Sequence, residues 1–104
     1  MLKIRYTKLA AEDLKNGYEH IFADNRSAAR DVIVRVMQTL DLLASEPRIG
    51  HPGRVNGTYE FLVLNTPYII VYMVERNELI VVSFLHTSRR YPEVSNMEIL
   101  PFES

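Results

Sequence analysis

The chain has 104 residues, with 12 lysines and arginines against 13 aspartates and glutamates, and no cysteine. This length suits one domain with a single core, and the lack of cysteine excludes disulfides and thiolate metal sites. No apolar run reaches the roughly 18 residues that a membrane span needs, so we expect a cytoplasmic domain without a membrane partner. The net charge of −1 argues against general nucleic-acid binding.

The first predicted elements are a strand and a helix. Residues 2–6 alternate apolar and polar side chains, as a half-buried strand does. Thr7 suits a helix N-cap, and apolar side chains then recur at spacings of three and four over residues 8–23. Gly17 disfavours the middle of this helix by about 1 kcal/mol relative to alanine. We therefore expect the helix to be either weak or closely packed at that point.

A second helix is predicted over residues 28–45, which form the strongest helical pattern in the chain. One side of this helix is apolar and the other is mostly polar. Asn25 or Ser27 can cap its start. Its end is set by Pro47, because a residue that precedes proline is pushed out of the helical region. Two helices joined by about three residues form an antiparallel hairpin.

Three strands are predicted after a loop over residues 47–57, which is rich in proline and glycine. The strand-like runs cover residues 59–64, 68–74 and 79–85, and the short connections between them suit hairpin turns. Consecutive strands with such turns form an antiparallel meander. The expected fold class is therefore α+β, with an N-terminal strand, an antiparallel helix hairpin and a three-stranded antiparallel meander packed on the two helices.

Residues 93–104 differ in composition from the rest of the chain. They hold three glutamates and no basic residue, so the remainder has 12 basic against 10 acidic side chains. That excess is still too small for a strongly electrostatic nucleic-acid binder. Ile99, Leu100 and Phe102 make the segment too apolar for a solvated tail. We expect residues 1–92 to form the domain, and the acidic tail to pack on that domain or on a partner.

Four short motifs follow one another along the chain. They are YTKLAAEDL at residues 6–14, GRVNGTYE at 53–60, PYIIVY at 67–72 and LHTSRRYP at 85–92. Together with the order of the predicted elements, these motifs resemble the RelE/ParE superfamily of bacterial toxins from type II toxin–antitoxin systems.

This resemblance implies a growth-inhibiting toxin, linked to plasmid stabilisation and neutralised by a cognate antitoxin. An antitoxin helix or strand would bind a groove of the domain, and operator DNA would be reached only through the antitoxin. The superfamily has two branches that act differently. RelE-like toxins cut mRNA in the ribosome, whereas ParE-like toxins poison DNA gyrase, and neither implies a cofactor or a metal ion. A third interpretation is a non-toxic binding module of the same fold.

Three positions on the predicted strands oppose the RelE-like mechanism. Metal-independent RNA cleavage needs a base for the 2′-hydroxyl, stabilisation of the phosphate charge and an acid for the leaving oxygen. The resemblance implies cations for this work at positions that align with Glu60, Leu62 and Ile69. A carboxylate and two aliphatic side chains cannot replace them. We therefore favour ParE-like inhibition of DNA gyrase, with a ribosome-dependent mRNA endonuclease as the alternative.

Histidine offers the nuclease alternative another acid–base group, because its side chain exchanges a proton near neutral pH. The catalytic residues would then be His86, Arg89 and Tyr91. His86 or His51 would act as the base, and Arg89 with Arg54 would hold the phosphate. Tyr91 would stack on a base or relay a proton. The competing interpretation is that both histidines are surface residues, and their spacing alone does not bring them together.

Arg54, Arg89 and Arg90 are the predicted partner-binding residues, since a guanidinium binds both carboxylate and phosphate. They would recognise an acidic antitoxin segment or nucleic acid. The competing interpretation is structural. Arg89 and Arg90 would then be solvated or paired with an acidic segment, and Arg54 would be a hydrogen-bond donor within its loop.

Overall fold

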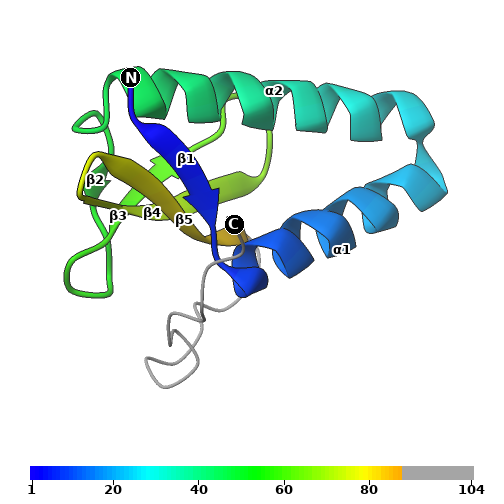
Figure 1. The fold of residues 1–104 in the computed structure, drawn as a ribbon. Coiled ribbons are helices and arrows are strands. Elements are labelled where there is room, and N and C mark those ends of the chain that lie inside the picture. Colours follow the sequence, from blue (N-terminus) through cyan, green and yellow to red (C-terminus); the bar gives the residue numbers. More distant parts are fainter. Residues whose placement is uncertain (88–104) are drawn as a thin grey trace.

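The computed structural model describes residues 1–87, which form two helices and a five-stranded sheet (Figure 1). The elements in chain order are β1 (Lys3–Tyr6), α1 (Lys8–Asp24), α2 (Arg26–Ser45), β2 (His51–Pro52), β3 (Tyr59–Leu62), β4 (Tyr68–Glu75) and β5 (Glu78–His86). The strands lie in the order β1-β5-β4-β3-β2, with β1 parallel to β5 and the other neighbours antiparallel. The expected α+β class, with its N-terminal strand, helix hairpin and meander, is confirmed.

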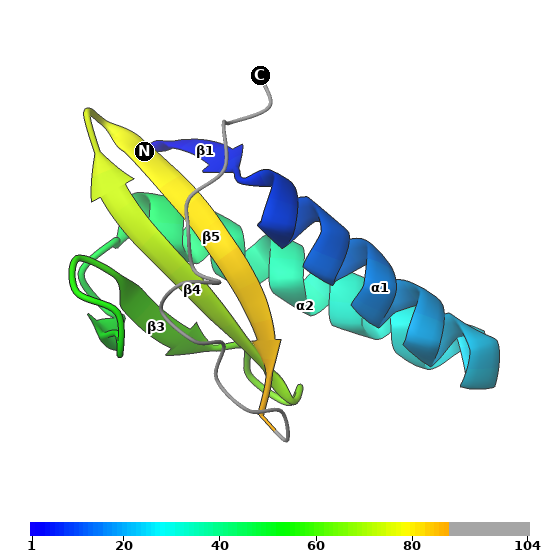
Figure 2. The same cartoon turned by 90° about the horizontal axis from the view of Figure 1, so that it is seen from below.

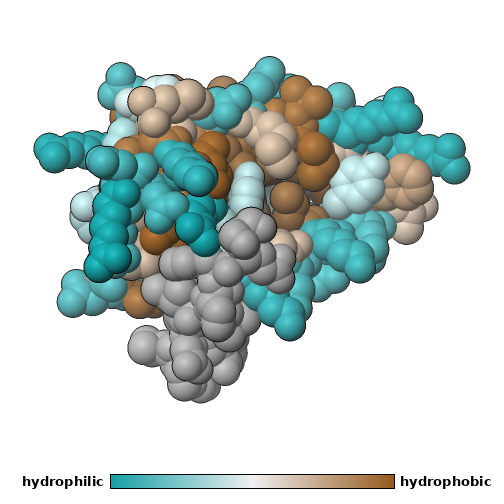
Figure 3. All heavy atoms as spheres, in the orientation of Figure 1, coloured by the Kyte–Doolittle hydropathy of each residue, from teal (hydrophilic) through white to brown (hydrophobic). Residues whose placement is uncertain are grey.

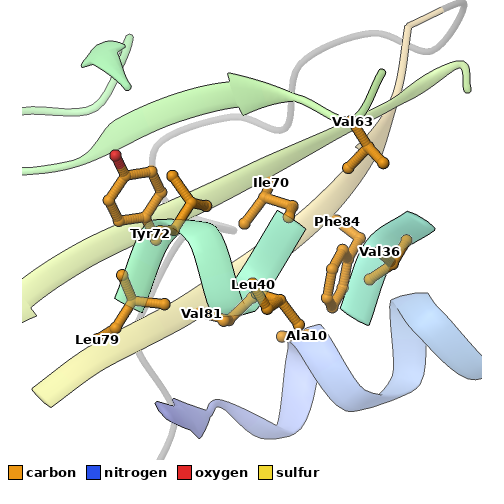
Figure 4. Packing of buried hydrophobic residues seen from close by; sticks show 10 residues of the cluster. Ala10, Val36, Leu40, Val63, Ile70, Tyr72, Leu79, Val81 and Phe84 are labelled. Carbon is orange, nitrogen blue, oxygen red and sulfur yellow. The ribbon is translucent and has the colours of Figure 1, made fainter. Parts of the chain in front are cut away.

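Both helices cover the same face of the sheet (Figures 1 and 2). The core lies between these two layers, where α2 contributes the apolar stripe expected from its sequence (Figure 4). The fully buried residues of this core include Ala10, Val36, Leu40, Leu43, Val63, Ile70, Tyr72, Leu79 and Val81. Tyr72 carries the one hydroxyl of this set, and that hydroxyl donates to the Pro47 carbonyl at 2.7 Å.

Side-chain caps fix where both helices begin. The Thr7 hydroxyl accepts the N–H of Ala10 at 3.1 Å and donates to the Val82 carbonyl of β5 at 2.8 Å. One side chain therefore starts α1 and ties it to the sheet. Asn25, the first of the two predicted caps, accepts the N–H of Ala28 at 3.0 Å, so α2 begins slightly earlier than expected.

Two details of the sheet differ from the sequence-based expectation. The loop predicted over residues 47–57 contains β2, a two-residue strand that pairs with β3. Such a short strand has no alternation that a sequence pattern could reveal. Strand β3 ends at Leu62, two residues before the predicted end, because the N–H of Thr66 donates to the Val63 carbonyl and closes a turn there.

Candidate functional site

The end of β5 places His86 against Tyr68 at the start of β4. The two residues are partners in the strand register, and their ring centroids lie 5.3 Å apart with the planes at 88°. Tyr68 also lies against α1, since a Cβ added at Gly17 would be 3.1 Å from the tyrosine hydroxyl oxygen. The absent side chain of Gly17 gives Tyr68 its room. Of the two expectations for this glycine, close packing is the correct one.

The predicted residues beyond β5 follow from the same corner of the sheet. Thr87 donates its N–H to the Pro67 carbonyl at 2.8 Å, which holds the strand end beside the turn between β3 and β4. Arg89, Arg90 and Tyr91 come next in the sequence but lie outside the described residues. Their expected catalytic and partner-binding roles therefore stay predictions.

Asp13 on α1 is a structural contributor to this corner that the sequence analysis missed. Its carboxylate accepts the Ser83 hydroxyl at 2.8 Å and the N–H of Phe84 at 3.3 Å. Strand β1 ends at Tyr6, so it does not pair with this part of β5. The Asp13 carboxylate provides hydrogen bonds to β5 there instead. One signal was available, because Asp13 follows Ala10 by three residues and so belongs to the sheet-facing side of the helix.

Arg54 belongs to a different part of the sheet, the loop between β2 and β3. Its backbone N–H donates to the carboxylate of Glu60 at 2.9 Å, and the Glu60 side chain is only 3% exposed. Inside the loop, the Thr58 hydroxyl donates to the Val55 carbonyl and Gly53 donates its N–H to the Thr58 carbonyl. The Arg54 side chain is exposed on this ordered loop, as a partner-binding residue requires.

His51 and His86 are kept apart by the sheet. His51 pairs with Glu60 on β3, whose partner on β4 is Val71, whereas His86 pairs with Tyr68. Three strand spacings and an offset of three residues put the two histidine Cα atoms roughly 17 Å apart. The structure therefore does not join them into a catalytic pair.

Glu60, Leu62 and Ile69, the three strand positions that the sequence analysis set against a RelE-like mechanism, have different surroundings in the structure. Glu60 is buried and holds the Arg54 backbone. Leu62 is 51% exposed at the end of β3, and Ile69 is partly buried on β4. None of the three brings a positive charge to the sheet, so a phosphate at these positions would meet one carboxylate and two aliphatic groups.

Two shallow apolar grooves lie beside the helix hairpin. The first separates the outer sides of α1 and α2, where apolar side chains gather in Figure 3. It is lined by Tyr6, Ala11, Leu14, Lys15, Tyr18, Ile33 and Met37. The second lies between α2 and β3 and is lined by Arg35, Gln38, Thr39, Leu42, Phe61, Leu62 and Leu64. The sequence predicted a groove but not which elements would form it.

Metal binding and membrane insertion are two further possibilities for residues 1–87. No group of three or more potential metal-ligating side chains occurs in this part of the chain. Neither of its helices is long and apolar enough to cross a membrane.

Comparison with known proteins points to one family. The family model described as "ParE toxin of type II toxin-antitoxin system, parDE" matches residues 4–91. A curated protein of Sinorhizobium fredii, named "Putative toxin Y4kP", is 33% identical over 92 residues, which cover 88% of this chain and 95% of that protein. A solved structure titled "Chromosomal ParDE TA system from P. aeruginosa" has a TM-score of 0.73 at 19% identity, covering 83% of this chain and 96% of the other.

These findings agree with the fold and with the sequence motifs. The structural likeness supports the fold alone, while the family model spans nearly all of the described domain and the curated relative is similar over almost its full length. The chain belongs to the ParE toxin family of type II toxin–antitoxin systems.

Proposed function

We propose that this ParE-family toxin inhibits bacterial growth by acting on DNA gyrase in the cytoplasm, and that a cognate antitoxin neutralises it. The observation that carries the proposal is the chemistry of the middle strands. Glu60, Leu62 and Ile69 stand where the RelE-like branch would need cations, and the carboxylate of Glu60 is already engaged by the loop of Arg54. The strands thus lack the charges that would stabilise a cleaved phosphate.

The alternative is an mRNA endonuclease that acts in the ribosome. One observation favours it: His86 is held by Tyr68 at the end of β5, next to the segment that carries Arg89 and Tyr91. A general base needs such a fixed position. His51, the other candidate base, is too far away to assist. The remaining alternative is a non-toxic binding module of the same fold.

The antitoxin is proposed to bind the apolar grooves beside the helix hairpin. An amphipathic segment can place its apolar side chains in such a groove. Arg54, Arg89 and Arg90 would recognise acidic groups of the same partner. Operator DNA would then be contacted through the antitoxin alone, in agreement with the small net charge of the toxin.

An experiment in cells separates the three possibilities. The chain is induced in bacteria, with and without co-expression of the proposed antitoxin, and both a reporter plasmid and total RNA are recovered. We expect growth arrest with loss of plasmid supercoiling, intact mRNA, and recovery when the antitoxin is present. Intact supercoiling with codon-positioned mRNA cuts would favour the endonuclease. Unaffected growth with folded protein present would contradict the toxin proposal altogether.

A further inference from the structure

His86 lies on the face of the sheet that the helices cover. It is the register partner of Tyr68, and two residues directly opposite each other in a sheet point to the same face. The Tyr68 side chain contacts α1, since its hydroxyl oxygen would be 3.1 Å from a Cβ at Gly17. Phe84, two residues before His86 on β5, belongs to the main core, which agrees with this direction. The end of β5 therefore carries His86 on the helix side of the sheet.

Tyr68 is the side chain that joins α1 to His86. Its ring and the His86 ring form an edge-to-face pair, with the centroids 5.3 Å apart and the planes at 88°. Aromatic rings prefer such an arrangement, so the pair has a defined geometry. The atoms Cε1 and Cζ of the tyrosine ring would be 3.4 Å from a Cβ at Gly17. A displacement of Tyr68 by α1 would therefore be passed to His86.

The same side of α1 also holds the strand that carries His86. Asp13 precedes Gly17 by four residues, so the two lie on one face of the helix. The Asp13 carboxylate accepts the Ser83 hydroxyl of β5 at 2.8 Å. Asp13 thus fixes the strand, whereas the absent side chain of Gly17 sets how closely Tyr68 approaches the helix. Both contacts place the end of β5 relative to α1.

The packing around Tyr68 leaves little room for its ring to move away from His86. One pocket lies next to this corner, between the helices and the sheet, and Asp13, Gly17 and Tyr68 are among the residues that line it. Its volume of about 10 Å³ is at the lower limit for a single water molecule. A tyrosine ring is much larger than this space. A methyl group added at Gly17 would therefore shift Tyr68, because the pocket cannot absorb the displaced ring.

We propose that Tyr68 is a positioning residue that fixes the orientation of the His86 ring, and that Gly17 permits this because a side chain there would displace Tyr68. The toxin needs His86 in this orientation to inhibit growth. The second statement rests on the proposed growth inhibition, although not on whether gyrase or the ribosome is the target. All the contacts involved lie within residues 1–87, whereas the acidic tail expected at residues 93–104 lies outside the described residues.

NMR spectra of the purified chain report the orientation of His86 directly. The chain has three histidines, so His20 and His51 serve as internal references and His86→Ala assigns the remaining signals. The couplings between the Hα and Hβ protons of His86 measure its χ1 rotamer. We expect one staggered rotamer in the wild type and in Tyr68→Phe, which keeps the ring, and an average over rotamers in Tyr68→Leu. An unchanged rotamer in Tyr68→Leu would overturn the positioning role.

Gly17→Ala tests the link to the helix, and Gly17→Ala/Tyr68→Phe is its matched control. Alanine is intrinsically better than glycine in a helix, so the single variant remains informative even where Tyr68→Leu fails to fold. Its methyl group should push the tyrosine hydroxyl and thereby shift the ring-proton signals of His86. Tyr68→Phe removes the atom in closest contact, 3.1 Å away, and should restore these signals. Signals that move equally with and without the hydroxyl would overturn the link.

Growth arrest after induction tests whether this orientation matters for toxicity. We expect Tyr68→Leu and Gly17→Ala to need about tenfold more induced protein for the same arrest, as the loss of one well-placed contact residue does. Tyr68→Phe and the double variant should act like the wild type. Tyr59→Leu is the control for lost stability, because Tyr59 packs on Tyr72, away from His86. It should keep full toxicity.

The outcomes separate this inference from the proposed function. A wild-type chain that leaves growth unaffected would contradict the proposed function, while the NMR measurements still decide whether Tyr68 positions His86. Arrest by the wild type together with full toxicity of Tyr68→Leu, in spite of an averaged His86 rotamer, would overturn this inference alone. An equal loss of toxicity in Tyr59→Leu would assign the effect to stability and would overturn it as well.

Discussion

The Tyr72 hydroxyl is a polar group of the core that makes two hydrogen bonds to the backbone. It accepts the N–H of Gly50 at 3.1 Å and donates to the Pro47 carbonyl at 2.7 Å, and so fixes the chain that leaves α2. Tyr72→Phe leaves both backbone groups without this partner. We expect a loss of about 1–3 kcal/mol in the free energy of unfolding, measured by urea denaturation. The control is Tyr59→Phe, whose ring stacks on Tyr72 with centroids 5.6 Å apart; an equal loss in both variants would contradict this assignment.

From the environment of the same tyrosine, we expect the stability of the domain to be sensitive to alkaline pH. The pKa of Tyr72 is raised above its ordinary value of 10.0, chiefly by burial and also by Tyr59, while the Gly50 hydrogen bond opposes the rise. The folded state therefore keeps the proton that the unfolded state loses. This stabilisation is fully present below pH 10 and is lost as the pH rises through the raised pKa. Burial first, and then Asp41, raise the pKa of Tyr6 in the same direction.

Unfolding curves at increasing pH test this linkage. Above pH 10 we expect the wild type to lose stability more steeply than Tyr72→Phe, since the variant lacks one of the two perturbed phenols. Tyr6 should account for part of the remaining slope. Parallel pH profiles for the two proteins would contradict the role given to Tyr72.

The Asp13 carboxylate is expected to stabilise the corner that holds His86. Asp13→Ala removes the acceptor for the Ser83 hydroxyl and the N–H of Phe84. A loss of about 1–3 kcal/mol in the free energy of unfolding is expected, because the bonds to this charged group are partly buried. The matched control is Glu12→Ala, the exposed neighbour on the same helix. Similar unfolding midpoints for the two variants would show that Asp13 has no such role.

The predicted recognition residues are tested by growth assays. We expect His86→Ala and Arg89→Ala to relieve growth inhibition with little change in thermal stability, since neither residue belongs to the described core. Thr87→Ala and Arg30→Ala are the controls, as both residues are exposed and the second is also an arginine. Full toxicity of both test variants would show that the site lies elsewhere.

At the scale of single residues, the sequence predicted local geometry better than long-range contacts. Thr7 and Asn25 were identifiable as caps because capping depends on neighbours three residues away. Asp13 and Glu60 were not, because their partners are set by the way helix, loop and sheet pack together. Ser83 is 70 positions from Asp13, and no local pattern reports that contact.

At the scale of elements, the junction between the helices depends on one side chain. Asn25 ends α1 with its backbone N–H on the Ile21 carbonyl and starts α2 with its side chain. Asn25→Ala should lower the free energy of unfolding by about 1 kcal/mol. Asp24→Ala, the preceding exposed residue, is the control and should be neutral or slightly stabilising, because an acidic side chain at a helix C-terminus is unfavourable. The reverse order of effects would contradict the capping role.

Element boundaries were predictable where periodicity is long. The two helices and the strands β4 and β5 lie close to their expected ranges, because each has several turns or alternations. Strand β2 was missed, since two residues carry no period. Local sequence patterns also could not predict the position of β1 in the sheet. It pairs in parallel with β5, the last strand, and only the return of the chain over the helix hairpin sets that pairing.

At the scale of the whole molecule, the sequence predicted the fold class and the protein family. It did not determine the molecular target of the toxin. The order of elements and motifs led to the superfamily, and the family model and the curated relative then confirmed the ParE toxin family. The target depends on surface chemistry instead. Three features of the chain bear on the target. They are the middle strands without cations, the corner at His86, and residues Arg89 to Tyr91, which lie beyond the described part of the chain.

The most direct test of ParE-like action is a supercoiling assay with purified components. Relaxed plasmid, DNA gyrase and ATP are incubated with increasing amounts of the toxin, alone or with its antitoxin, beside an mRNA cleavage assay on translating ribosomes. The account predicts dose-dependent loss of supercoiling, reversal by the antitoxin, and intact mRNA. Normal supercoiling together with codon-positioned cuts in the mRNA would contradict it.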